Sequence, residues 1–177
     1  MSSLLKNIIR FALFILVQVF ILHKIPSLHR FVTPYLYFLY ILWLPFRMPR
    51  FALMAVAFLF GLTLDYFLMR PGLHAAPCVL IAYLRPFLIN LLISQEGADN
   101  NYSSPSITSM GAAPYATYVL VLTLIHHSYL VLLEWIDFGN FFYFLGKVTA
   151  TTGVSFLLIL ITELLFFRKE RFRTNTI

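Results

Sequence analysis

Two charged side chains lie within apolar stretches of the sequence, where a charge is costly. Asp65 lies in the first of two apolar runs between Phe58 and Leu88, and Arg85 lies in the second. A charged side chain near the centre of a membrane helix costs about 2.5–3.5 kcal/mol on insertion scales. These two residues therefore either form hydrogen bonds inside a bundle of helices or organise a surface that binds a partner or a ligand.

Glu163 is a third acidic or basic residue inside an apolar run, about one helical turn before the basic C-terminal tail. At a rise of about 1.5 Å per residue, Asp65 lies about 6 Å below the outer surface and Arg85 about 18 Å below it. Glu163 lies nearer the depth of Arg85. The spacing therefore predicts an ion pair between Arg85 and Glu163 rather than one between Arg85 and Asp65.

His126 and His127 raise the question of a metal site or a proton relay. Adjacent residues on a helix point about 100° apart, so the two rings do not form one site. We interpret His126 as a packing residue that makes a hydrogen bond. The sequence also has no acidic cluster spaced for Mg²⁺, no Ser/His/Asp arrangement and no glycine loop that binds phosphate. We therefore expect no enzymatic activity, no metal site and no cofactor.

The composition is that of an integral membrane protein. Of the 177 residues, 60% are hydrophobic and 11% are charged, and the mean hydropathy is +0.84. Soluble domains have about 45–50% apolar and about 25% charged residues. The thirteen Lys and Arg residues are spread over the termini and short loops. That distribution records orientation in a membrane and does not favour nucleic-acid binding. We predict one all-α membrane domain over residues 1–177.

The apolar runs predict about six membrane spans. The second is short against the ~20 residues that a helix needs to cross a bilayer, and it contains Pro34. A re-entrant segment therefore stays open as an alternative. Both chain ends are basic, so we expect both termini in the cytoplasm, which requires an even number of crossings. The polar segment 94–113 is expected to be a flexible cytoplasmic loop. The predicted spans are 8–22, 31–44, 51–69, 73–92, 114–133 and 144–167.

The third and fourth spans are expected to form the centre of the bundle. Ala57, Gly61 and Asp65 recur every four residues and so share one helix face. Small residues at this spacing let a neighbouring backbone approach closely. A short turn at 70–72 makes the two spans antiparallel neighbours. Pro86 removes a backbone donor directly after Arg85 and predicts a kink in the fourth span.

Three short motifs carry a resemblance to a known family. They are Gly61-Leu62-Thr63-Leu64-Asp65, Gly72-Leu73-His74-Ala75 and Ala82-Tyr83-Leu84-Arg85-Pro86. Over about residues 51–92 the sequence resembles the rod shape-determining protein MreD family. The resemblance implies a compact helical bundle similar to the substrate-binding subunits of energy-coupling-factor transporters. It also implies a non-enzymatic scaffold of the cell-elongation machinery in the bacterial inner (cytoplasmic) membrane, which supports peptidoglycan synthesis and rod shape.

The partners that the resemblance implies are an MreC-like single-span protein and, through it, MreB, RodA and a penicillin-binding transpeptidase. We hypothesise that the Gly61/Asp65 face, with Gly72 and His74 at its outer end, supports the interface with MreC. The alternative is a substrate-binding membrane subunit of a vitamin-type transporter, which would need a polar pocket open to the outer face. The candidate partner-binding or structural residues are Gly61, Asp65, Gly72, His74, Arg85, Pro86 and Glu163.

Overall fold

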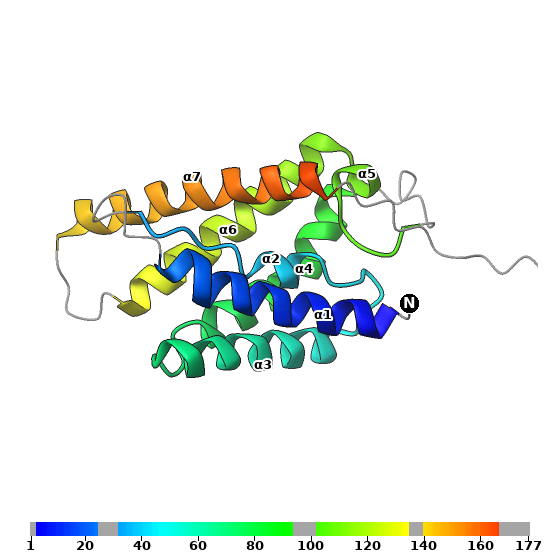
Figure 1. Ribbon diagram of the computed structural model, residues 1–177. Helices are drawn as coiled ribbons and strands as arrows, with labels where there is room; N and C mark the ends of the chain where they lie inside the picture. Colours follow the sequence, from blue (N-terminus) through cyan, green and yellow to red (C-terminus); the bar gives the residue numbers. More distant parts are fainter. Residues whose placement is uncertain (1–2, 25–31, 94–101, 135–139, 167–177) are drawn as a thin grey trace, which may run out of the picture.

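The computed structural model describes residues 3–24, 32–93, 102–134 and 140–166, and these form a bundle of helices that lie side by side (Figure 1). Within them, five helical stretches are long and apolar enough to cross a membrane. The chain is therefore an all-α, multi-pass membrane protein. The long helices are α1 (Ser3–Leu16), which continues through single turns to Lys24, α3 (Arg50–Leu68), α4 (Ala75–Leu92), α6 (Ala112–Glu134) and α7 (Phe141–Leu165).

The long helices lie where five of the six apolar runs were expected to form spans. α3 packs against α4, α4 against α6, and α6 against α7. Helix α4 continues through Pro86 to its end. α1 begins and α7 ends at the same end of the bundle (Figure 1). The basic C-terminal tail lies outside the described residues.

The second apolar run differs from its prediction. A helical span was expected over 31–44, but the only helix there in the described residues is the short α2 (Leu39–Leu42). Residues 32–36 have no regular structure and lead into a turn. In Figure 1 this stretch runs alongside the helices, from the end of the bundle where α1 finishes to the end where α3 begins. We call residues 32–46 the central segment.

The central segment is the most enclosed part of the bundle. From Tyr37 to Leu44 every side chain is at most 5% exposed. An extended residue advances about 3.3 Å, against about 1.5 Å in a helix. Partly extended backbone therefore explains how a run too short to cross as a helix still passes along the bundle. Such backbone is tolerated at membrane depth only where protein surrounds it.

Side chains of the surrounding helices satisfy the backbone of this segment. The side-chain oxygen of Gln18 accepts hydrogen bonds from the N–H groups of Leu36 (3.0 Å) and Tyr37 (3.4 Å). The hydroxyl of Ser155 on α7 accepts one from the N–H of Tyr35 (3.1 Å). These bonds replace those that a helix would have made within itself, so the segment depends on its neighbours for its shape.

The polar stretch 94–113 was expected to be a flexible loop. Residues 94–101 lie outside the described part, but residues 102–113 are folded onto the bundle. They contain the short helix α5 (Ile107–Met110), which begins with a capping box formed by Ser106 and Ser109. The carbonyl of Ser103 accepts a hydrogen bond from the N–H of Phe46 (3.0 Å). The second half of the stretch is thus attached to the end of the central segment.

Candidate functional site

Asp65 binds the beginning of α4. Its Oδ2 accepts hydrogen bonds from the N–H groups of Gly72 and Ala75, each at 3.0 Å, and its Oδ1 accepts one from the N–H of His74 (2.8 Å). The first N–H groups of a helix have no partner within that helix, and the helix dipole favours a negative charge there. Asp65 on α3 therefore caps α4 and fixes the corner between the two helices.

His74 adds a fourth hydrogen bond to the same carboxylate. Its Nδ1 lies 2.7 Å from Asp65 Oδ1, and the two side chains are 3% and 1% exposed. An ionised carboxylate only accepts hydrogen bonds, so Nδ1 carries the proton. The His74 ring also packs against Tyr35 and Tyr37, with ring centroids 6.3 and 5.5 Å apart.

Gly61 is the position at which α3 comes closest to α4. A Cβ atom added there would lie 2.4 Å from the Cα of Ala75 and 2.9 Å from the carbonyl oxygen of His74. Only glycine fits this approach. One turn later, Asp65 reaches the α4 terminus that the approach brings near. The spacing of the first motif therefore places Gly61 at the contact between α3 and α4 and Asp65 at the cap of α4.

This geometry changes the hypothesis about the partner interface. The face of α3 that carries Gly61 and Asp65 was expected to support contact with an MreC-like helix. In the structure both residues are buried and contact α4 of the same chain. They influence a bound partner only through the frame that α3 and α4 form together.

Arg85 binds the far end of the central segment. Its Nε donates to the Tyr118 hydroxyl (3.0 Å), and its terminal nitrogens donate to the carbonyls of Leu44 and Pro45. The Tyr118 hydroxyl in turn donates to the carbonyl of Leu42 (3.0 Å). The carbonyls of Leu44 and Pro45 lie just beyond the end of α2, where the backbone has left the helix. The Arg85 side chain is 2% exposed, and its guanidinium supplies hydrogen-bond donors to this irregular backbone.

Glu163 lies in a neighbouring set of hydrogen bonds. Its carboxylate accepts from the Tyr115 hydroxyl (2.9 Å) and from the N–H of Ile107 at the start of α5 (3.3 Å). The Trp43 indole N–H donates to the same hydroxyl (3.2 Å). Glu163 therefore connects α7 with α5, α6 and the central segment.

The predicted ion pair between Arg85 and Glu163 is wrong. In the described part of the chain, Arg85 binds a hydroxyl and carbonyl oxygens and makes no ion pair with Glu163. The prediction compared depths in the membrane and had no information on what lies between the two helices. The structure fills that space with the tyrosines of α6 and with the central segment.

We expect charge reversal to show the difference. Arg85→Glu places a carboxylate against two carbonyls and lowers the free energy of unfolding by about 3 kcal/mol or more. Glu163→Arg is also destabilising, and the double reversal is no more stable than the worse single variant. Size-exclusion chromatography of fluorescently tagged protein in detergent measures the folded fraction. Recovery to the wild-type level in the double variant would mean that the two side chains pair after all.

The two histidines of α6 are buried in the centre of the bundle. His126 stacks on Phe38, with ring centroids 4.5 Å apart, and its Nε2 lies 2.9 Å from the Tyr37 hydroxyl. His127 lies near Thr152, with 3.4 Å between Nδ1 and Oγ1. Among the residues that the structure describes, no three His, Cys, Asp or Glu side chains converge to hold a metal ion. The geometry of His126 is that of a packing residue with one hydrogen bond.

A polar pocket lies at the end of the bundle where α3 and α6 finish and α7 begins, and its volume is about 350 Å³. Within it, the Glu134 carboxylate bridges Arg70 (3.4 Å) and Lys147 (2.6 Å). Sequence analysis missed this site, although a charge near the ends of the third, fifth and sixth apolar runs was a visible signal. We call it the end pocket; its lining residues are His23, Thr33, Tyr35, Leu68, Arg70, His74, Glu134 and Lys147.

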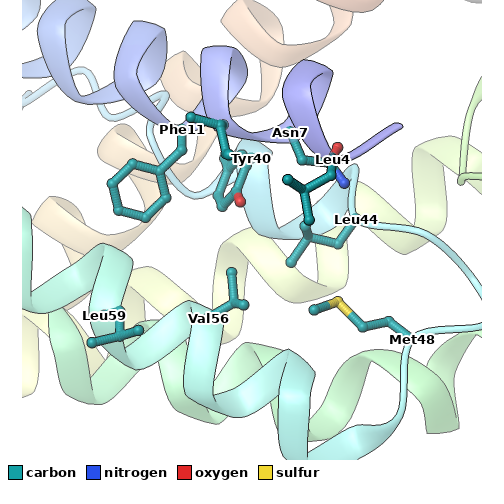
Figure 2. Close-up of a pocket in the computed structure, with 9 residues that line it drawn as sticks. Leu4, Asn7, Phe11, Tyr40, Leu44, Met48, Val56 and Leu59 are labelled. Atoms are coloured by element: carbon teal, nitrogen blue, oxygen red, sulfur yellow. The ribbon is translucent and has the colours of Figure 1, made fainter. Parts of the chain in front are cut away.

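An apolar groove of about 410 Å³ lies between α1 and α3. Figure 2 shows Leu4, Asn7 and Phe11 of α1 on one side, and Val56 and Leu59 of α3 on the other. Side chains of the central segment lie between them. We call it the side groove; the other lining residues are Ile8, Tyr40, Leu44 and Met48.

Comparison of the chain with protein families, with curated proteins and with solved structures yields no match.

Proposed function

We propose that this chain is a non-enzymatic scaffold of the cell-elongation machinery in the bacterial inner membrane, of the kind that MreD-like proteins provide. In this role it binds an MreC-like single-span protein and, through it, supports MreB, RodA and a penicillin-binding transpeptidase in peptidoglycan synthesis. We also propose that its bundle is similar to that of energy-coupling-factor substrate-binding subunits.

The observation that supports this proposal most is that residues of the motifs make contacts between the elements of the bundle. Gly61 and Asp65 join α3 to α4, and Arg85 joins α4 to the central segment. Three polar residues of the motifs, Asp65, His74 and Arg85, are buried and committed to the frame of the bundle. The other two, Thr63 and Tyr83, are not: Thr63 binds a carbonyl of its own helix, and Tyr83 is 47% exposed. The three committed residues hold a shape, which is what a scaffold must offer to its partner.

A six-crossing topology fits the same proposal. The central segment, taken as a crossing, adds to the five long helices and gives an even number. α1 then begins and α7 ends on one side, as their positions in Figure 1 require. Basic residues near both chain ends favour the cytoplasm for that side. The end pocket then faces the outer side of the membrane.

The side groove is the surface that we assign to the partner helix. It is lined mainly by apolar side chains, and it lies between two helices that both expose large apolar residues on their outer faces. In a membrane such faces contact lipid or another helix. In lipid, helices associate through close packing rather than through hydrophobicity. A partner helix therefore binds better in a concave groove than on a flat face of the bundle.

We expect Leu59→Trp to fill the side groove and to lower the amount of MreC-like protein that co-purifies by about tenfold, which corresponds to about 1.4 kcal/mol of binding free energy. Leu157→Trp on α7 is the matched control, since the two leucines are 56% and 59% exposed. Co-purification of tagged variants from cells that lack the native copy measures the effect, and cell shape is recorded in parallel. Equal loss in both variants, or loss in neither, would place the partner elsewhere.

The end pocket supports a second candidate function, that of a substrate-binding subunit of a small-molecule transporter. Such a subunit needs a polar pocket open to the outer face, and the end pocket is polar and lies at one end of the bundle. A transporter subunit would co-purify with a paired ATPase and a coupling membrane protein. The scaffold would co-purify with wall-synthesis proteins, so one experiment separates the two candidates.

A further inference from the structure

The end pocket gathers charges from three elements that are distant in sequence. Arg70 lies in the turn after α3, Glu134 is the last residue of α6, and Lys147 lies in the second turn of α7. Two cations thus face a single carboxylate. The Arg, Lys and Glu side chains of the pocket therefore sum to a net positive charge.

The donors of the two cations are only partly used. The Arg70 side chain is 58% exposed, and in the described residues one of its N–H groups reaches Glu134 (3.4 Å). The Lys147 side chain is 19% exposed and donates to the other oxygen of the same carboxylate (2.6 Å). Both groups have further N–H donors available. The carboxylate therefore lies where the two cations converge, and it leaves some of their N–H donors unused.

We propose that the end pocket binds a phosphate group through Arg70 and Lys147, and that Glu134 occupies the anion position in the free protein. On binding, the phosphate takes over the contacts of the two cations, and the carboxylate gives way. This inference goes beyond the scaffold role and does not depend on it.

Phosphate is the class of anion that the position and chemistry of the pocket favour. Arginine forms paired hydrogen bonds with phosphate oxygens, and lysine adds a compact charge. The pocket lies at the ends of membrane helices, which is the level of lipid headgroups. The phosphate of a lipid headgroup and that of a soluble phosphate compound share this chemistry, so the experiment must distinguish them.

The test uses the full chain purified in detergent, with native mass spectrometry to count retained lipid. The probes are phosphatidylglycerol, a diacylglycerol with the same acyl chains but no phosphate, and inorganic phosphate as a competitor. We expect the wild-type protein to retain phosphatidylglycerol in preference to diacylglycerol. Displacement by millimolar inorganic phosphate would identify a soluble phosphate compound as the natural ligand. Resistance to displacement would identify the lipid headgroup.

If the proposal is right, removing a cation and removing the carboxylate change the retention of phosphatidylglycerol in opposite directions. Lys147→Gln and Arg70→Gln each weaken retention by about tenfold, the usual loss for one charge-assisted hydrogen bond. Glu134→Gln strengthens it, because the competing carboxylate is gone. Arg50→Gln, at the other end of α3, is the control and changes nothing. A purely structural role for Glu134 predicts unchanged or weaker retention in Glu134→Gln, and that result would overturn the proposal, as would equal retention of the two lipids. Arg70, the more exposed cation, keeps the test valid if Lys147→Gln does not fold.

Discussion

Replacing Gly61 with leucine is expected to lower the free energy of unfolding by about 3 kcal/mol, at the upper end of the usual cost of overpacking. The reason is that even a Cβ atom at this position would lie 2.4 Å from the Cα of Ala75. The obstacle is backbone, which cannot move aside as a flexible side chain can. α3 must therefore shift away from α4, and the cap that Asp65 provides shifts with it.

Gly153→Leu is the matched control for this prediction. Gly153 lies within α7, and an added Cβ meets nothing within 4 Å. The same substitution there should leave the unfolding transition unchanged. Thermal unfolding in detergent, followed by the loss of monodisperse protein, compares the two variants. Equal stability of the two proteins would contradict the close approach of α3 and α4 at Gly61.

Asp65→Asn is expected to cost about 3 kcal/mol of stability, because an unsatisfied buried donor costs about 1–3 kcal/mol. Each carboxylate oxygen accepts two hydrogen bonds, from Gly72 and Ala75 at one oxygen and from His74 twice at the other. An amide keeps one oxygen and replaces the other by an NH₂ group. Turned one way, the amide nitrogen faces the N–H groups of Gly72 and Ala75. Turned the other way, it faces the backbone N–H of His74, whose ring can accept at Nδ1 in its other tautomer. In either orientation at least one buried backbone donor faces a donor.

The effect should be local to the beginning of α4. Hydrogen exchange followed by mass spectrometry is expected to show faster exchange at residues 72–78 in Asp65→Asn than in the wild-type protein. Thr63→Val is the control, since Thr63 lies on the same helix and its hydroxyl binds only the carbonyl of Leu59 among the described residues. Unchanged exchange at the α4 terminus would mean that Asp65 does not cap this helix.

The sequence was sufficient to predict the class of protein and the long helices. A run of apolar residues must satisfy its backbone in lipid by forming a helix, so α3, α4, α6 and α7 follow from their own composition. The small residue Gly61 and the turn at 70–72 were also enough to predict that α3 and α4 are antiparallel neighbours. These features are local, and local chemistry decides them.

The shape of the central segment could not be predicted in this way. Its backbone bonds go to Gln18, Ser155, Tyr118 and Arg85. These residues lie on four different helices, so the extended path exists only after the bundle has assembled. A run of apolar residues with one proline gives no sign of such partners.

The candidate site also divides into features that the local sequence predicts and features that only the assembled fold shows. Sequence analysis singled out Asp65, Arg85 and Glu163 because a charged residue inside an apolar run needs a partner. The identity of each partner came only from the fold, and the expected pair of Arg85 with Glu163 was wrong for that reason. The end pocket was missed because its charges lie near helix ends, where charges are common, and only their convergence marks them.

The most direct test of the central claim is to purify the tagged chain from its own membranes in mild detergent and to identify its companions by mass spectrometry. The scaffold proposal predicts an MreC-like single-span protein together with a RodA-like glycosyltransferase and its transpeptidase. Recovery of an ATPase with a coupling membrane subunit, and no wall-synthesis protein, would contradict the proposal and identify a transporter subunit instead.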